Sequence, residues 1–424
     1  MKKTTSLIFK KPYRFFKGQS NRILETVFFI VTHKKRMSGL KISDSKKRNI
    51  LFIVPGLPIG GSERVVLNIA KGINRKEFNF HVITTDNFES HWYGKYQLYF
   101  KNIIVPFWRR PYDKICFNYF KELISKLNID IVIISNSLTG YRFLPLLKSE
   151  FKNITAIDIR HADWQEFRIK EIVPYLDKRI CISNHLKQHI SQQYLRYGLA
   201  NIYQKRLKVI HNGIDETKYK PIKKKKNRFK LKFEIPHETK IISFVGRLST
   251  GKNLSLLVNI AKKIIETSHK ENIIFVLAGE GEEMNNIRNM IKKYKIQNNF
   301  ILTGQLNDNE IIELLMDTHI LLITSKHEGI PLVISEALAM GVPVISTNVG
   351  AIDEIIDHNI NGYLVDINKD VTEQFSSKIL NLIKNERKYL ELSKKTRKTI
   401  LPEYSYKTMG NKYKEIFNKC INKK

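Results

Sequence analysis

The sequence is poor in cysteine and in long apolar runs. Its three cysteines, Cys116, Cys181 and Cys420, are far apart and form neither a CxxC pair nor a zinc-ligand spacing. Such a set is typical of reduced, structural cysteines and points to the cytoplasm. The longest early apolar run, Val27–Val31, is far shorter than the roughly 20 residues that a membrane-spanning helix needs. The basic start of the chain does not have the pattern of a signal peptide. We therefore expect a cytoplasmic protein that does not cross a membrane.

Acidic residues are also scarce, since 40 Asp and Glu stand against 73 Lys and Arg, a formal net charge of +33. Part of this excess can reflect a coding bias toward lysine. It also favours contact with an anionic membrane face or with phosphate-bearing substrates. The bases are spread along the chain without a recognition-helix or aromatic-rich motif, so we expect no nucleic-acid partner.

Several ligand-binding signatures are absent. No GxGxxG is followed about 20 residues later by an acidic ribose ligand, which disfavours a nicotinamide dehydrogenase. The spacing of a P-loop, GxxxxGK[ST], is missing as well. No Asp-x-Asp or His-rich ligand set accompanies the phosphate-binding motifs described below, so we expect no cofactor and no obligatory metal.

What is present indicates two domains, as the length of 424 residues suggests. Residues 1–48 hold fourteen Lys and Arg, two acids and several aromatic side chains. This composition is typical of an interfacial membrane element, and a disordered leader or a structural helix is the alternative. Short apolar runs then alternate with amphipathic stretches. The runs interpreted as strands are Ile50–Val54, Phe80–Thr84, Ile129–Ser135, Ile154–Ile159 and Lys178–Ile182, and the first helix is expected over Ser62–Gly72.

A second alternating series begins near Lys240. Its expected strands are Ile241–Val245, Ile273–Ala278, Phe300–Thr303, Ile320–Thr324 and Pro343–Ser346, and its expected helices are Asn253–Thr267, Glu282–Tyr294, Asn309–Met316 and Leu332–Met340. Apolar strands separated by helices indicate parallel sheets covered on both faces. We predict an α/β fold of two facing Rossmann-like domains, residues 49–219 and 239–403. A basic linker and hinge at 220–238 joins them, and a C-terminal helix in 404–424 packs back on the first domain.

The first motif that carries chemistry is Pro55–Glu63, which joins the first strand to the first helix. Gly60 and Gly61 let the backbone approach a ligand, and the helix N-terminus offers free N–H groups and a partial positive charge. The motif suits a phosphate or a sugar. The alternative is a tight turn with Ser62 as the helix N-cap.

The second motif, Phe244–Asn253, occupies the same junction of the second domain. Arg247 and Lys252 lie five residues apart beside a helix N-terminus. Two cations placed there match a diphosphate, whose charge grows as it departs as a leaving group. The alternative is a pair of ordinary exposed bases in a basic chain.

The third motif, Glu328–Glu336, follows the strand that ends near Thr324. Glu328 is expected in the loop at the C-terminal edge of the sheet, where open α/β sheets bind ligands. Glu336 lies on a helix that is apolar almost all round, and a buried carboxylate needs a partner. The hydroxyls of a bound ribose fit this need, and a structural partner elsewhere in the fold is the alternative.

Taken together, the ordered motifs resemble those of the retaining glycosyltransferase family 4. They are GGSER at 60–64, HNGID at 211–215, VGRLSTGKN at 245–253, LAGEGEE at 277–283, TG at 303–304, Glu328 with Glu336, and EALAMGVPVISTNVGAIDEII at 336–356. The resemblance covers about residues 49–420. It implies a GT-B fold with the acceptor in the N-terminal domain, the donor in the C-terminal domain, and a role in bacterial surface-polysaccharide assembly.

The resemblance also implies residue roles. The predicted catalytic residues are Glu328 and His161, which contact the transferred sugar, and Arg247 and Lys252, which hold the diphosphate. The predicted donor-binding residues are Gly60, Gly61, Arg247, Lys252, Gly279, Glu280, Gly281, Leu332, Val333 and Glu336, the last of them contacting the ribose. Leu332 and Val333 are included because Pro331 stands where many members have glycine and offers no N–H donor.

The implied reaction moves a sugar, with retention, from a nucleotide sugar to a glycan or lipid-linked acceptor at the inner face of the cell membrane, with peripheral attachment. A UDP-sugar is favoured over a GDP-sugar as the donor. Catalysis would depend on positioning and charge stabilisation, because the sequence offers no clear nucleophile. One alternative is an epimerase of the same fold that alters a nucleotide sugar without an acceptor. The other is a membrane-associated binding protein that has lost catalysis.

Overall fold

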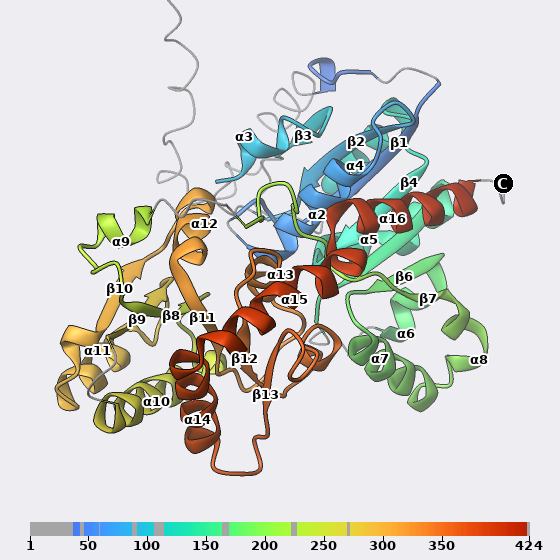
Figure 1. Ribbon diagram of the computed structural model, residues 1–424. Coiled ribbons are helices and arrows are strands. Elements are labelled where there is room, and N and C mark those ends of the chain that lie inside the picture. The colour runs from blue at the N-terminus through green and yellow to red at the C-terminus, as the bar shows by residue number, and fades with distance from the viewer. Residues whose placement is uncertain are drawn as a thin grey trace, which may run out of the picture.

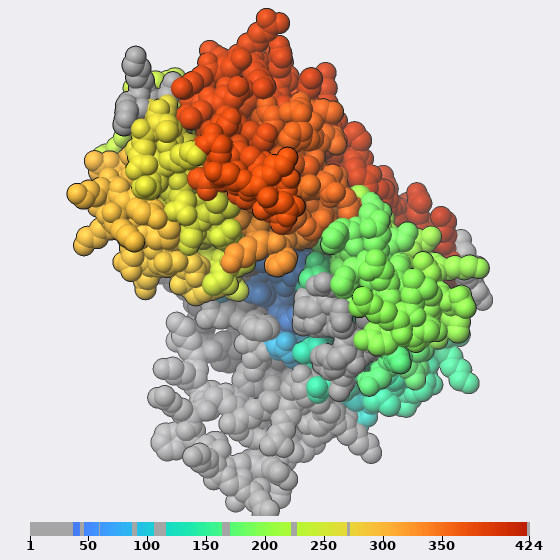
Figure 2. All heavy atoms as spheres, turned by 90° about the horizontal axis from the view of Figure 1, so that it is seen from below, coloured from blue at the N-terminus to red at the C-terminus, as the bar shows by residue number. Residues whose placement is uncertain are grey.

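The computed structural model describes residues 37–42, 46–58, 60–86, 91–105, 114–162, 169–221, 227–268 and 272–421. Two α/β domains lie side by side, each built on a parallel sheet with helices on its faces (Figure 1). Seen from below, the domains meet along a recess, in which N-terminal residues coloured blue are visible (Figure 2). The predicted fold class is therefore confirmed. Residues 1–36, to which most of the membrane hypothesis applies, lie outside the described residues.

The first domain contains a seven-stranded sheet in the order β3-β2-β1-β4-β5-β6-β7. Its central strands are buried along nearly their whole length, as apolar strands covered on both faces should be. The strands are β1 (Arg48–Val54), β2 (Phe78–Thr84), β3 (Asn102–Ile104), β4 (Ile131–Ser135), β5 (Thr155–Arg160), β6 (Lys178–Cys181) and β7 (Leu207–Val209). The helices are α2 (Gly61–Gly72), α3 (Tyr93–Tyr96), α4 (Lys114–Lys126), α5 (Leu138–Glu150), α6 (Ile169–Ile172), α7 (Asn184–Arg196) and α8 (Ala200–Tyr203).

The second domain contains a six-stranded parallel sheet in the order β10-β9-β8-β11-β12-β13. Its strands are β8 (Lys240–Val245), β9 (Ile273–Ala278), β10 (Phe300–Gly304), β11 (Thr318–Ile323), β12 (Val344–Thr347) and β13 (Gly362–Val365). Its helices are α9 (Arg228–Lys232), α10 (Leu254–Thr267), α11 (Met284–Lys293), α12 (Asp308–Asp317), α13 (Leu332–Ala339), α14 (Val371–Lys384) and α15 (Glu386–Tyr404). In both domains the strand order reverses beside the first strand, the topology that leaves a ligand crevice at the C-terminal strand edge.

The last helix, α16 (Tyr406–Ile421), follows the second domain in sequence but packs against α2 of the first (Figure 1). Tyr413 and Phe417 are buried in the core of the first domain, where Phe417 contacts Phe78 edge to face. The chain thus crosses between the domains twice. The two crossings are hydrogen-bonded to each other, because Ile214 donates to the carbonyl of Tyr404 at 2.9 Å and accepts from the amide of Tyr406 at 2.8 Å.

The structure corrects one alternative and adds detail to two segments. The N-cap of α2 is Gly60 and not Ser62, whose hydroxyl donates to Glu63 inside the first helical turn. Within the predicted linker, α9 folds onto the second domain, where Phe229 is buried. Within the predicted N-terminal extension, Met37 is buried against the first domain. In the part of the chain that the structure describes, no helix is both long and apolar enough to span a membrane.

Candidate active site

A cavity of about 930 Å³ lies between the domains, at the C-terminal ends of β1, β8 and β9. It is lined by residues of both domains, among them Arg64 of α2 and Gly246 after β8. All the predicted donor-binding residues line it: Gly60, Gly61, Arg247, Lys252, Gly279, Glu280, Gly281, Leu332, Val333 and Glu336. The structure therefore brings together residues that are spread over almost 280 positions of the sequence. Glu328 and His161 are not part of this lining and lie beside it.

The wall from the first domain is the N-terminus of α2. The N-cap residue of this helix, Gly60, has no side chain to cap it, and the acidic side chain of Glu63 lies in the first turn. A methyl group added to Gly61 would meet nothing within 4 Å, which leaves open space directly over the helix end. The carboxylate of Glu63 folds back toward Gly60, and burial raises its pKa.

The wall from the second domain is made of glycine-containing loops that pack backbone against backbone. The amide of Leu248 donates to Glu280 at 2.8 Å, and the amide of Gly279 donates to Gly304 at 2.8 Å. Gly279 has a φ of +146°, and a Cβ there would lie 1.9 Å from the carbonyl oxygen of Gly246. Both the positive φ and this overlap exclude a side chain at position 279. Gly279 is therefore needed to close the loops of the cavity.

Arg247 and Lys252 both follow β8 and differ in their surroundings. The side chain of Arg247 is exposed to the cavity, and no ion pair to it occurs among the described residues. Lys252 lies in a short 3₁₀ turn and donates from Nζ to Oε1 of Glu328 at 2.5 Å. Thr324 fixes this turn by donating its hydroxyl to the carbonyl of Lys252 at 2.9 Å. One cation is thus unpaired, and the other is held by an acidic side chain.

Glu328 lies in the loop after β11, as the sequence predicted for the sheet edge. Its Oε1 accepts hydrogen bonds from Lys252 and from the hydroxyl of Ser325 at 2.6 Å, and its side chain is 11% exposed. Gly350 packs closely on this loop, because a Cβ there would lie 1.8 Å from the carbonyl oxygen of Glu328. The loop is therefore fixed from two sides, and the carboxylate is oriented before any ligand arrives.

His161 follows β5 in the first domain. Its Nε2 lies 3.0 Å from Oγ of Ser135, and burial lowers its pKa to about 4. The ring is therefore neutral at pH 7 and suited to hydrogen bonding with a hydroxyl, not to carrying charge. A Cβ at Gly329 would lie 3.7 Å from the carbonyl oxygen of His161, so His161 and the Glu328 loop face each other across the domain boundary.

Glu336 has a partner in the protein, which was the alternative left open by the sequence. Its Oε1 accepts a short hydrogen bond from Arg64 of α2, and its side chain is only 2% exposed. Oη of Tyr219 lies 3.5 Å from Nη1 of the same Arg64, and burial, together with the charge of Glu336, raises the pKa of that phenol. Arg64 is part of the GGSER motif, but the sequence assigned it no role. Tyr219 and Asp308, which also contact Arg64, were not predicted from the sequence.

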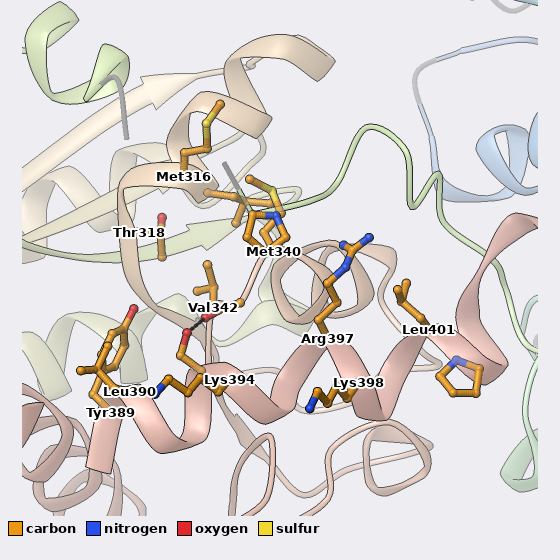
Figure 3. A pocket seen from close by; sticks show the side chains of 15 residues that line it. Met316, Thr318, Met340, Val342, Tyr389, Leu390, Lys394, Arg397, Lys398 and Leu401 are labelled. Atoms are coloured by element: carbon orange, nitrogen blue, oxygen red, sulfur yellow. Dashed lines mark hydrogen bonds between the residues drawn. The ribbon is translucent and has the colours of Figure 1, made fainter. Parts of the chain in front are cut away.

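A second cavity, of about 890 Å³, lies on the other side of α13, along α15 (Figure 3). It contains none of the predicted site residues. Its lining includes Arg397, which donates to the carbonyls of Tyr219 at 2.7 Å, Ala339 at 2.6 Å and Glu216 at 3.2 Å. Arg397 thus ties the first crossing between the domains to the end of α13, the helix that carries Glu336.

Metal binding receives no support from the described residues, since no group of three or more His, Cys, Asp or Glu side chains is placed to hold an ion there. The cationic side chains that line the cavity are Arg64, Arg247 and Lys252.

Comparison with known proteins identifies the class. Two facing Rossmann-like domains with a cavity between them form the GT-B fold, and similar solved structures share this fold. A glycosyltransferase from Rickettsia africae has a TM-score of 0.75 at 21% identity and covers 89% of this chain and 100% of its own. Anabaena Alr3699/HepE in complex with UDP-glucose has a TM-score of 0.71 at 17% identity and covers 88% and 99%.

The sequence comparisons identify the family. The sequence model described as Glycosyltransferase Family 4 matches residues 59–218, and the model described as Glycosyl transferases group 1 matches residues 224–399. N-acetyl-alpha-D-glucosaminyl L-malate synthase of Bacillus anthracis is 24% identical over 374 residues, 85% of this chain and 94% of that protein. The chain belongs to glycosyltransferase family 4 and is a glycosyltransferase.

Proposed function

We propose that the protein transfers a hexosyl or N-acetylhexosaminyl residue, with retention, from a UDP-sugar to a glycan or lipid-linked acceptor in cell-surface polysaccharide biosynthesis. The observation that carries this proposal is the grouping of Arg247, Lys252 and Glu336 around one cavity, with Glu328 paired to Lys252. The uncapped N-terminus of α2 faces them from the other domain. Such an arrangement suits a nucleoside diphosphate, with the sugar directed toward Glu328 and His161.

The residues around the cavity would stabilise the charge of the leaving diphosphate and hold the transferred sugar in position. Arg247, Lys252 and the first N–H groups of α2 stabilise the negative charge that grows on the diphosphate as its bond to the anomeric carbon breaks. The acceptor oxygen bonds to that carbon on the same face, and its proton passes to the departing phosphate oxygen. When the donor binds, the ammonium group of Lys252 breaks its hydrogen bond to Glu328 and binds the phosphate. The carboxylate of Glu328 is then free to contact the sugar. Neutral His161 accepts or donates a hydrogen bond to a sugar hydroxyl.

The donor base, the acceptor and the place of action draw support from relatives. The Anabaena structure contains UDP-glucose. An Escherichia coli relative, 29% identical over 164 residues, 38% of this chain and 42% of that protein, is named UDP-Gal:alpha-D-GlcNAc-diphosphoundecaprenol alpha-1,3-galactosyltransferase. A diphosphoundecaprenol acceptor is a membrane lipid, so we place the reaction at the inner face of the cell membrane, with the protein attached peripherally.

A nucleotide-release assay tests the donor. The pure protein is incubated with UDP-, GDP- and dTDP-sugars and an acceptor mixture in excess EDTA, and both nucleotide and glycan products are analysed. We expect UDP release with a new glycosidic product of retained configuration. An altered free sugar without a glycosidic product would instead identify an epimerase. Complete loss of activity in EDTA, restored by magnesium or manganese, would contradict the metal-independent mechanism.

Two substitutions test the site. We expect Glu328→Gln and Lys252→Ala each to lower kcat by about 10²- to 10³-fold, the usual effect of removing one charge-stabilising group. Lys262→Ala, in which an exposed lysine of α10 loses its ion pair with Glu266, is the matched control and should retain activity. Circular dichroism and thermal unfolding confirm that all three variants are folded. Near-native turnover in both site variants would show that the assignment is wrong.

A further inference from the structure

Arg64 belongs to the first domain, yet its guanidinium binds two acidic residues of the second. Nη1 donates to Oε1 of Glu336 on α13, and Nη2 donates to Oδ1 of Asp308 on α12 at 3.1 Å. The guanidinium carbon lies 5.5 Å from the ring centroid of Trp92, a buried side chain of the first domain. Arg64 is therefore supported from behind and directed across the domain boundary.

Asp308 is held by a second cation of the first domain. Nζ of Lys95 donates to Oδ2 of Asp308 at 2.7 Å and lies 4.6 Å from the Trp92 ring centroid. The position of Asp308 in the first turn of α12 is set by a capping box in which Asn307 and Glu310 bond each other's backbone. The contact is thus a network of two cations and two carboxylates, which fixes the orientation of the Arg64 fork.

Glu336 needs such a partner because its side chain is 2% exposed. A carboxylate buried without a cation is strongly disfavoured in its charged form. Burial works against the charge of Arg64 as well, but Glu336, Tyr219 and Asp308 together outweigh that cost and raise its pKa above the usual value. A carboxylate has about four acceptor positions, and the bond from Arg64 occupies only part of this capacity. Acceptor positions remain on Glu336, which lines the cavity.

We propose that Arg64 is a positioning residue for the nucleoside: it orients the Glu336 carboxylate toward the ribose hydroxyls of the donor, and only while the two domains face each other. The proposal rests on the proposed function, because it takes a nucleotide sugar as the ligand of this cavity. When the domains separate, Glu336 loses the guanidinium that orients it. Nucleoside binding and domain closure therefore favour each other, as two linked equilibria must.

The experiment pairs a substitution with a change in the nucleotide. Calorimetry measures the binding of UDP and of 2′,3′-dideoxy-UDP to the wild-type protein, Arg64→Met, Arg64→Lys, Glu336→Gln, and the double variant with Arg64→Met and Glu336→Gln. Arg48→Met is the control, since Arg48 pairs with Asp130 within the first domain. We expect the wild type and the control to prefer UDP by about 10- to 100-fold, the usual effect of hydrogen bonds to a charged group.

In Arg64→Met the preference for UDP should fall to within about threefold of unity, and Arg64→Lys should recover part of it. Glu336→Gln should show the same loss, and the double variant should lose no more than either single one, because both changes act on one interaction. A residue that only stabilises the fold would weaken both nucleotides equally and keep their ratio.

Two results would overturn the inference, and they are distinguishable. If Arg64→Met keeps the wild-type preference for UDP, Arg64 does not act through the ribose, while the proposed donor stands. If the wild-type protein binds neither nucleotide, the proposed donor is wrong and the inference is wrong with it.

Discussion

Gly61 and Gly279 line the same cavity for different physical reasons. Gly279 has a positive φ and packs on the backbone of Gly246, so its lack of a side chain is a requirement of the fold. Gly61 is the first residue of α2, and a methyl group there would touch nothing in the protein. Its lack of a side chain therefore matters only when a ligand occupies the space.

The two glycines lead to opposite expectations for alanine substitution. Gly61→Ala should leave the free energy of unfolding unchanged or raise it by up to about 1 kcal/mol, because alanine restricts the unfolded chain. It should weaken UDP binding by about tenfold or more. Gly279→Ala should lower the free energy of unfolding by about 2 kcal/mol or more, since a strained backbone and an overlap coincide. Urea denaturation and calorimetry measure both quantities, and equal stability losses in the two variants would contradict this division of roles.

A buried histidine makes stability depend on pH. His81 in β2 is 0% exposed, and Nδ2 of Asn102 lies 2.9 Å from its Nδ1. Burial, with a smaller effect of Lys101, lowers the pKa of His81 from 6.5 to about 4. In the unfolded chain His81 is therefore protonated as the pH falls below about 6.5. In the folded protein it is protonated only below about pH 4. The stabilisation is fully present above pH 6.5 and is lost as the pH falls from there toward 4.

We expect this group to lower the free energy of unfolding by about 2 kcal/mol between pH 7 and pH 5. His81→Gln, which cannot titrate, should lose about 2 kcal/mol less over the same interval. His161 acts in the same direction in both proteins, so the difference between them isolates His81. Urea denaturation at several pH values provides the comparison, and parallel pH profiles for the two proteins would rule out the proposed origin.

At the scale of elements, the apolar central strands could be predicted from the sequence, whereas of the four edge strands only β10 could. The runs at β8 and β9 were placed to within one residue, because both are apolar and flanked by helical patterns. The strands β3, β7 and β13 were missed, and each lies at an edge of its sheet. They have only three or four residues, and their extended form depends on pairing with β2, β6 and β12.

The candidate site divides in the same way. Gly60, Arg247 and Glu328 were recognisable because each lies in a local motif at the end of a strand. The partnership of Arg64 with Glu336 was not, since the two residues are 272 positions apart and neither motif alone contains the contact. The sequence indicated that Glu336 requires a partner. Only the structure, in which the two domains face each other, shows that this partner is Arg64.

The contact between α2 and α16 depends on two glycines. A Cβ at Gly410 would lie 2.4 Å from the carbonyl oxygen of Gly72, and a Cβ at Gly72 would lie 2.2 Å from the carbonyl oxygen of Tyr406. The helices therefore cross backbone against backbone. We expect Gly410→Ala to lower the free energy of unfolding by about 1–3 kcal/mol, because α16 must move away from the core of the first domain.

Gly94→Ala is the control for this helix contact, since its added methyl group meets nothing within 4 Å. Urea denaturation compares the two variants. If Gly410→Ala were as stable as the control, α16 could move away from α2 without lowering the free energy of unfolding, which would contradict the prediction.

At the scale of the whole molecule, the net charge of +33 bears on the place of action. We expect the full-length protein to sediment with anionic liposomes at low salt and to be released at high salt, because each base near the surface contributes about 1 kcal/mol and salt screens it. A chain without residues 1–36 retains Met37, which is buried in the first domain, and should bind more weakly yet keep its activity on a soluble acceptor. Unchanged sedimentation would assign membrane binding to the folded domains.

The return of α16 to the first domain also has a consequence for synthesis on the ribosome. Between Ile214 and Ser405, which are paired side by side, the chain of the second domain is continuous. The first domain is instead split, with Tyr413 and Phe417 filling its core from the end of the chain. Proteins with several domains generally fold from the N-terminus as they emerge. Here we expect a different order, because the first domain cannot complete its core until α16 has been translated, after the whole of the second domain.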